Sequence, residues 1–190
     1  MNVYDGIPKF SGENFLLRGV VAEDAEDLLK VYSDKKAVPY FNGDNCHGDD
    51  FYYSTLERMQ EAIKFWLFSY DNGYFVRWAI IDKKTSVAIG TIELFHHDDE
   101  VEAYDNSGIL RLDLRSDYEK ESVIYEILSL IMPSVLDYFG DKIVTKVKSF
   151  AKERLAAVSR LGFVLPEVGF KLQNGEERGD YFVVNLGDEK

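Results

Sequence analysis

The sequence predicts a single domain of the α/β (α+β) class. Its 190 residues suit one domain, because a domain usually holds about 100–200 residues. Hydrophobic residues make up 46% of the chain and aromatic residues 14%, a composition that supports a buried core. Stretches with the period of a strand are interleaved with stretches with the period of a helix. The predicted domain covers residues 1–190, with an irregular arm over about residues 1–14.

The first half of the chain is predicted to contain three strands and two helices. Apolar residues recur three and four positions apart in the helices, and the capping box Ser54-x-x-Glu57 opens the second of them. The last two strands are rich in β-branched and aromatic residues and are joined by a short polar turn, so they form a hairpin. In order, the elements are a strand over residues 15–20, helices over residues 25–32 and 54–70, and strands over residues 74–82 and 86–95.

The second half of the chain begins with a polar, acidic loop and continues with strands and helices in turn. Pro133 lies inside the long helix, where it removes one amide donor and predicts a kink. Gly162 suits the end of the last helix, because glycine readily adopts the left-handed conformation found there. In order, the elements are a loop over residues 96–107, a strand over 109–114, a helix that includes 123–139, a strand over 143–150, a helix over 151–161, and strands over 163–172 and 181–186.

Composition also excludes several classes of function. The formal net charge is −12, and such a chain repels a phosphate backbone, so we expect no direct nucleic-acid binding. Cys46 is the one cysteine, which leaves no internal disulfide and no thiolate-rich metal site. The N-terminal residues lack the features of a secretory signal, and no apolar run is long enough to span a membrane. We therefore expect a cytoplasmic protein without a metal.

Four segments in this order resemble the GNAT acyltransferase superfamily, and more closely its RimJ/RimL-like subgroup, which acetylates the N-termini of ribosomal proteins. The resemblance spans about residues 15–186. It is carried by Leu16-Leu17-Arg18 with Glu23-Asp24-Ala25, by the stretch from Tyr32-Ser33-Asp34 to Tyr40, by Trp78-Ala79-Ile80-Ile81 followed by Ile89-Gly90-Thr91-Ile92, and by Leu161-Gly162-Phe163.

The resemblance implies a mixed, mostly antiparallel central sheet that is flanked by helices and splayed between its fourth and fifth strands. It also implies that acetyl-CoA lies in the gap, where the backbone of residues 110–114 pairs with pantetheine and Leu112, Asp113 and Leu114 contact the cofactor. The activity implied is transfer of the acetyl group to a primary amine. The α-amine of a peptide or protein is favoured and a small amine comes next, with the enzyme a monomer or homodimer.

The pyrophosphate loop implied by the resemblance departs from the family pattern Gln/Arg-x-x-Gly-x-Gly/Ala. One register places Glu119, Ser122 and Ile124 at the three patterned positions, and a register shifted to Arg115 restores no glycine either. The predicted contacts of the pyrophosphate are Glu119, Lys120, Glu121, Ser122, Val123 and Ile124. In the last helix, Val158 stands where the family often has a tyrosine that acts as a general acid. These departures support an alternative, a catalytically inactive GNAT-fold binding or regulatory module.

Two charged segments add candidate site residues. Six basic residues lie between residues 142 and 160, and Lys148 and Lys152 are predicted to bind the phosphates of the cofactor, with a solvated surface as the alternative. Residues 93–105 contain acidic residues at positions 93, 98–100, 102 and 105 and no lysine or arginine. This segment is predicted to be either a rim that attracts an amine or a solvated loop. Within this run Glu93 is the predicted general base, and His96 and His97 are predicted substrate contacts.

Overall fold

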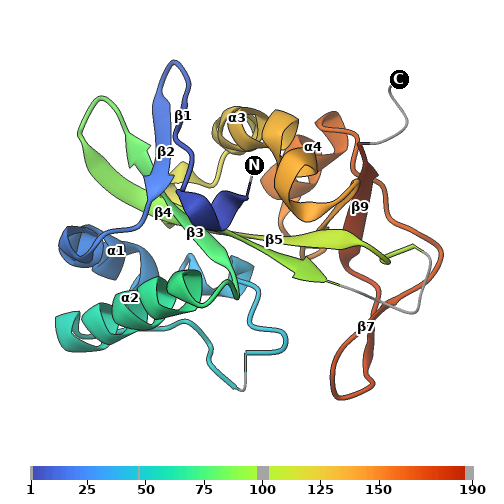
Figure 1. Ribbon diagram of the computed structural model, residues 1–190, viewed down its shortest axis with the longest axis horizontal. Coiled ribbons are helices and arrows are strands. Elements are labelled where there is room, and N and C mark those ends of the chain that lie inside the picture. Colours follow the sequence, from blue (N-terminus) through green and yellow to red (C-terminus); the bar gives the residue numbers. More distant parts are fainter. Residues whose placement is uncertain (1, 47, 98–102, 187–190) are drawn as a thin grey trace.

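A seven-stranded sheet forms the centre of the computed structural model, with two helices on each of its faces (Figure 1). The structure describes residues 2–46, 48–97 and 103–186. The strands follow the spatial order β1 (Phe10–Ser11), β2 (Phe15–Gly19), β3 (Val76–Asp82), β4 (Val87–His97), β5 (Ser107–Leu114), β6 (Lys142–Lys146) and β9 (Tyr181–Asn185). The helices are α1 (Ala25–Tyr32), α2 (Leu56–Asp71), α3 (Glu121–Phe139) and α4 (Lys152–Arg160). This arrangement confirms the predicted fold class.

The strands pair antiparallel except for β5 and β6, which are parallel. The pairing of β5 with β6 begins at Ser107 and Lys142 and ends at Leu110 and Thr145. Residues 111–114 of β5 continue beyond that point without a partner on β6. The sheet therefore separates between these two strands, as the resemblance implies.

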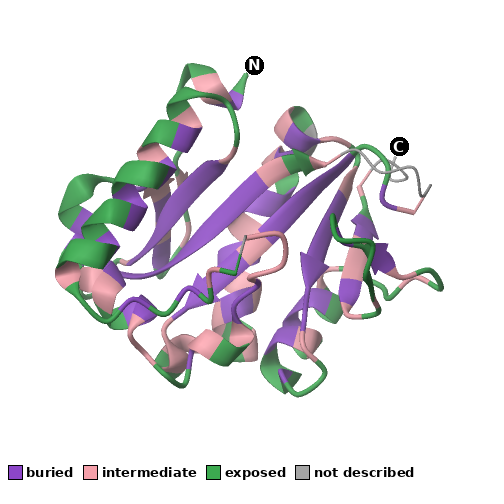
Figure 2. Cartoon of the chain, turned by 90° about the horizontal axis from the view of Figure 1, so that it is seen from below, coloured by how far each residue is buried: buried purple, intermediate pink, exposed green. Residues whose placement is uncertain are grey.

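Alternation along the strands divides the core into two layers. On β3, Val76, Trp78 and Ile80 pack against α3 and α4, whereas Ala79 and Ile81 pack against α1 and α2. Side chains of successive residues in a strand point to opposite faces, so this division follows from the sequence. Figure 2 shows the strands as a buried band, with the exposed residues on the outer sides of the helices.

The boundaries of several elements differ from the predictions. Helix α2 is capped by Thr55, whose side chain accepts a hydrogen bond from the amide of Arg58, so the capping box predicted at Ser54 is wrong. The strand predicted over residues 143–150 ends at Lys146. Residues 163–172 contain only an isolated bridge at Val164 and the short strand β7 (Phe170–Lys171), which pairs with β8 (Glu177–Arg178). The arm of residues 1–14 includes β1 and a single helical turn.

Candidate functional site

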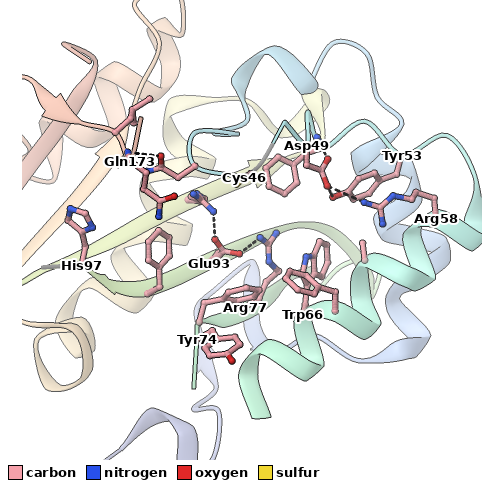
Figure 3. Close-up of a pocket in the computed structure, with 18 of the residues that line it drawn as sticks. Cys46, Asp49, Tyr53, Arg58, Trp66, Tyr74, Arg77, Glu93, His97 and Gln173 are labelled. Carbon is pink, nitrogen blue, oxygen red and sulfur yellow. Dashed lines mark hydrogen bonds and ion pairs between the residues drawn. The ribbon is translucent and has the colours of Figure 1, made fainter. Parts of the chain in front are cut away.

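A pocket of about 680 Å³ opens on the α1/α2 face of the sheet. Its walls come from the segment before α2, from α2 itself, from β3, β4 and β5, and from residues 171–173 after the start of β7 (Figure 3). Arg58, Arg77 and Arg111 line it, and we call it the arginine pocket. Its volume lies within the range of about 300–1,000 Å³ that is usual for small-molecule sites.

The floor of the pocket is a row of three charged residues on adjacent strands. Arg77 on β3 lies opposite Glu93 on β4, which in turn lies opposite Arg111 on β5. All three alternate with apolar residues that face α3 and α4, so strand geometry places them together on the α1/α2 face. The Glu93 carboxylate is paired with both guanidinium groups, and its distance to Arg111 Nη1 is 2.8 Å. Figure 3 shows the pairing of Glu93 with Arg77.

A second polar group lies behind this row and is buried. The hydroxyl of Tyr32 on α1 lies 2.8 Å from Thr91 Oγ1 and donates a hydrogen bond of 2.7 Å to Asp113 Oδ2. Arg77 Nη1 donates to the Tyr32 hydroxyl at 2.9 Å and lies 3.4 Å from Asp113 Oδ2. Burial raises the pKa of Asp113, although Arg77 and Tyr32 act in the opposite direction. One helix and three strands are therefore joined by one hydrogen-bonded cluster.

Glu93 lies in the site, but its surroundings oppose proton transfer. Its side chain is 3% exposed, and its two oxygens are bonded to Arg77 and Arg111. Burial acts to raise the pKa of Glu93, but the two guanidinium groups outweigh burial and the pKa lies below its usual value. A carboxylate that is held in its charged form is a weak acceptor for a proton at neutral pH. The predicted base role stays a prediction that this geometry does not favour.

The outer wall combines aromatic rings with a second ion pair. Arg58 Nη2 lies 3.1 Å from Asp49 Oδ2, and the guanidinium stands 4.5 Å from the centre of the Tyr53 ring. The Tyr53 hydroxyl donates to the same carboxylate oxygen at 2.9 Å. Deeper in the pocket, the guanidinium of Arg77 lies 4.1 Å from the centre of the Trp66 ring. The aromatic walls therefore already contact cations that belong to the chain.

The two histidines have different places. His97 lines the pocket, and its ring lies 5.1 Å from the ring of Phe170, whereas His96 is not among the lining residues. The acidic residues Asp98, Asp99, Glu100 and Glu102 lie outside the described residues. The substrate contacts predicted for both histidines, and the amine-attracting rim, stay predictions.

The predicted cofactor groove lies on the opposite face, where β5 and β6 separate. The cavity there measures about 10 Å³, and the Arg154 side chain from α4 is among the residues that line it. Arg154 Nη1 donates to the carbonyl of Leu112 at 2.8 Å and to the carbonyl of Tyr40 at 3.1 Å. Its Nε donates to Glu119 at 2.9 Å, and the two side chains are each 6% exposed. The chain's own guanidinium is therefore bonded to a backbone carbonyl of the segment, residues 110–114, that is predicted to pair with pantetheine.

The start of α3, where a pyrophosphate was predicted to bind, is also occupied by the chain. Glu153 Oε2 accepts a hydrogen bond of 2.7 Å from the amide of Glu121, the first residue of α3. The amide of Ile124 donates within the helix, to the carbonyl of Lys120. Carboxylates at a helix N-terminus satisfy the same amides that an anionic ligand would use. The predicted loop residues Ser122 and Val123 lie in the first turn of α3 and add no glycine.

The basic segment is largely engaged in ion pairs. Lys146 is paired with Asp44, and Lys148 Nζ lies 3.8 Å from Asp180. Arg160 lies 3.4 Å from Glu121. Lys152, the first residue of α4, is exposed. The phosphate contacts predicted for Lys148 and Lys152 stay predictions.

Taken together, the residues of the groove do not fit acetyl-CoA in the described conformation. Leu112 has its carbonyl bonded to Arg154, Leu114 is buried in the core beneath α3, and the Asp113 side chain points to the opposite face, where it is bonded to Tyr32. Sequence reasoning missed Arg77, Arg111 and Arg154 as site residues.

Among the described residues, no group of three or more metal-binding side chains is found, and no helix has the length and apolar character needed to cross a bilayer.

Comparisons with known proteins agree with this architecture. The structure is similar to RimL, the ribosomal L7/L12 α-N-protein acetyltransferase in complex with coenzyme A, with a TM-score of 0.70, 11% identity, and coverage of 94% of this chain and 98% of that one. It is also similar to the ribosomal-protein-S5-alanine acetyltransferase from Vibrio fischeri, with a TM-score of 0.65, 14% identity, and coverage of 96% and 99%. A GCN5-related N-acetyltransferase from Brucella melitensis gives a TM-score of 0.69 at 16% identity, with coverage of 97% of this chain and 81% of that one.

These structural likenesses show the fold, and the sequence itself shows the family. No curated protein matches the chain. Residues 14–164 match the family described as "Acetyltransferase (GNAT) domain", and this region is well over half of the 190 residues. The chain therefore belongs to the acetyltransferase (GNAT) domain family.

Proposed function

We propose that this GNAT domain is a binding module, with the arginine pocket as its ligand site, and that it does not hold acetyl-CoA in the groove between β5 and β6. The observation that carries the proposal is the position of Arg154, whose guanidinium donates to the carbonyl of Leu112 and pairs with Glu119 in that groove. A ligand that filled this groove must first displace this side chain.

Displacing Arg154 is unfavourable because the pair is buried. Separating one partner of a buried ion pair leaves an uncompensated charge and costs about 3–5 kcal/mol. That range corresponds to a loss of roughly 10² to 10⁴ in affinity. Glu153 also places its carboxylate on the first amide of α3, where it competes with a pyrophosphate for the helix N-terminus. Both effects act against acetyl-CoA.

The arginine pocket meets the physical requirements of a ligand site. It combines aromatic side chains with several fixed charged groups, and small-molecule sites likewise place convergent polar groups among aromatic walls. Its floor is rigid, since Arg77, Glu93 and Arg111 are held by ion pairs on three adjacent strands. A rigid site loses less conformational entropy when a ligand binds.

Family membership favours a second candidate function. In that function the protein is an N-acetyltransferase that moves the acetyl group of acetyl-CoA to a primary amine, with a peptide or protein α-amine preferred and a small amine next. The match over residues 14–164 and the likeness to RimL in complex with coenzyme A support it. It requires that Arg154 leave the groove. A cytoplasmic location and a monomeric or homodimeric state stay predictions under both functions.

Titration calorimetry with acetyl-CoA separates the two functions. We expect the native protein to show no saturable binding up to about 1 mM. The double variant Arg154→Ser with Glu119→Gln removes the guanidinium without leaving a buried charge, and we expect it to bind measurably. The matched control is Arg178→Ser with Glu176→Gln, an exposed pair 3.2 Å apart on and beside β8. Native binding near 10 µM or tighter (about −7 kcal/mol), with acetylation of a peptide amine detected by mass spectrometry, supports the acetyltransferase and contradicts the binding module.

A further inference from the structure

We infer that the ligand of the arginine pocket is an organic anion with an aromatic or apolar body, in chemical class an aryl carboxylate. This inference rests on the proposed function, because it names the ligand class of the same site. Three features carry it: the carboxylates of the pocket are saturated, its cations outnumber them, and its apolar walls are exposed at the mouth.

Both carboxylates of the described lining residues are already paired. The oxygens of Glu93 accept from Arg77 and Arg111. The oxygens of Asp49 accept from the Phe51 amide at 2.8 Å, from the Tyr53 hydroxyl at 2.9 Å and from Arg58 at 3.1 Å. A cationic amine recognises its site mainly through carboxylate oxygens, and these have their partners within the chain.

Cations exceed carboxylates in the same lining. Four positively charged residues and two carboxylates are present, the cations being Arg58, Arg77, Arg111 and Lys171. Asp113 behind Arg77 and the exposed Glu61, whose Oε2 lies 3.9 Å from Arg58, are outside the lining, and each offsets one positive charge when it is ionised. Lys171 is exposed on β7, and the side chain of Arg58 is 44% exposed on α2. The excess of positive charge is therefore confined to the side chains that line the pocket, which is where an anionic ligand would meet it.

The aromatic faces that would hold a cationic ligand are covered by the chain's own guanidinium groups. Arg58 lies over Tyr53, Arg77 over Trp66 at 4.1 Å, and Arg111 over Phe95 at 4.9 Å. A ring attracts one cation at its face, so these positions are taken. An ammonium group that entered the pocket would also lie near like charges.

The mouth of the pocket offers apolar surface for the body of the ligand. Phe65 on α2 is 59% exposed and Tyr74 is 62% exposed, and both line the pocket. The rings of Phe65 and Phe75 lie 6.2 Å apart in a tilted arrangement. Covering exposed aromatic surface is favourable at about 25 cal/mol per Å². A flat ring beside Phe65 and Tyr74 would therefore be bound by its faces, and its anionic group would lie near the exposed cations of the lining, Arg58 and Lys171.

Three probes that share one naphthyl body test the charge preference by calorimetry: 2-naphthylacetate, 2-naphthylacetamide and 2-naphthylethylamine. We expect the acetate to bind about tenfold tighter than the amide, and the amine to bind most weakly. Added salt should reduce the difference through screening. The inference is overturned if the amine binds as tightly as the acetate, or if none of the three binds at millimolar concentration.

Reversing one charge of the pocket lining is a second test of the inference. We expect Lys171→Glu to weaken binding of the acetate about fivefold and to leave the amide unchanged. The control Lys64→Glu makes the same change at an exposed position of α2 that does not line the pocket, and it should alter neither probe. Equal effects of the two variants on the acetate contradict the inference. Failure of the proposed function is detected separately, as binding of acetyl-CoA by the native protein in the titration described above.

Discussion

Tyr32 donates a hydrogen bond of 2.7 Å from its hydroxyl to Asp113, across the boundary between α1 and the sheet. Both side chains are buried, and the same hydroxyl also accepts from Arg77 and lies 2.8 Å from Thr91. The helix that covers this face is thus fixed to the strands that carry the floor of the arginine pocket. Stability of the fold and the shape of the pocket depend on the same contacts.

Replacing Tyr32 by Phe tests this coupling. The variant keeps the ring but leaves Asp113 and Arg77 each without one buried partner, which costs about 1–3 kcal/mol. Urea unfolding should show that loss in the free energy of unfolding. Tyr74→Phe removes a hydroxyl from a residue that is 62% exposed, and it should change the free energy by less than about 0.5 kcal/mol. Equal effects in the two variants would show that the buried hydroxyl does not stabilise the fold.

Acid should destabilise the protein, in part through Glu93. Its pKa is lower in the folded state than in the unfolded chain, because Arg77 and Arg111 outweigh burial. The stabilisation is therefore present above the unfolded pKa and is lost as pH falls through the folded value. Asp113 acts with the opposite sign, since burial raises its pKa. We expect the net free energy of unfolding to decline between about pH 5 and about pH 3.

A Glu93→Gln variant isolates the contribution of that residue. At neutral pH it should be less stable by about 3–5 kcal/mol, because two buried guanidinium groups lose their shared carboxylate. Its stability should also decline less steeply in acid, since residue 93 no longer titrates. Urea unfolding of both proteins across this pH range measures the two slopes. A decline of the same steepness in both would contradict the lowered pKa of Glu93.

The pair formed by Arg154 and Glu119 should behave as a buried ion pair in a double-mutant cycle. Arg154→Met alone leaves Glu119 charged and unpaired, with an expected loss of about 3–5 kcal/mol. Adding Glu119→Gln removes that charge and should recover part of the loss. Arg160 and Glu121 form the exposed comparison, 3.4 Å apart with side chains 55% and 40% exposed, and their coupling should stay below about 1 kcal/mol. Equal coupling in both pairs would contradict the buried role of Arg154.

Local patterns in the sequence were sufficient to predict most of the fold. Apolar residues at helical spacing between residues 25 and 32 predict α1, and the hairpin of β3 and β4 follows from β-branched and aromatic runs around a polar turn. Ends of elements were predicted less well. The cap of α2 is Thr55 and not Ser54, because both hydroxyl residues suit an N-cap and only tertiary packing chooses between them.

The pocket could be predicted only in part, because it depends on which strand residues lie opposite one another. Arg77, Glu93 and Arg111 are far apart in the sequence and meet through strand register. A signal was present: each is a polar residue flanked by apolar residues in a strand, which indicates a polar stripe on one face. No comparable signal marked Arg154, since a basic residue in a short amphipathic helix is usually solvated. Its place in the groove requires tertiary structure.

Gly90 provides a last test, because it sets the spacing of β4 and β5, the two strands that carry Glu93 and Arg111 of the pocket floor. A Cβ atom at this position would lie 2.2 Å from the carbonyl oxygen of Asp113 on the neighbouring strand. The obstacle is backbone, so no rotation of a side chain relieves it, and β4 and β5 must move apart. Gly90→Ala should therefore lower the free energy of unfolding by about 1–3 kcal/mol or more. Gly179→Ala, where a Cβ meets nothing within 4 Å, is the matched control and should change it little.

The same substitution should also weaken ligand binding, which a purely local strain would not do. Glu93 and Arg111 lie opposite each other on β4 and β5, three and two residues from Gly90 and Asp113, so a shift between these strands alters the ion pairs at the floor of the pocket. Calorimetry with 2-naphthylacetate on folded Gly90→Ala protein should show weaker binding than on the Gly179→Ala control. Unchanged affinity in the destabilised variant would mean that the floor of the pocket does not depend on the spacing of β4 and β5.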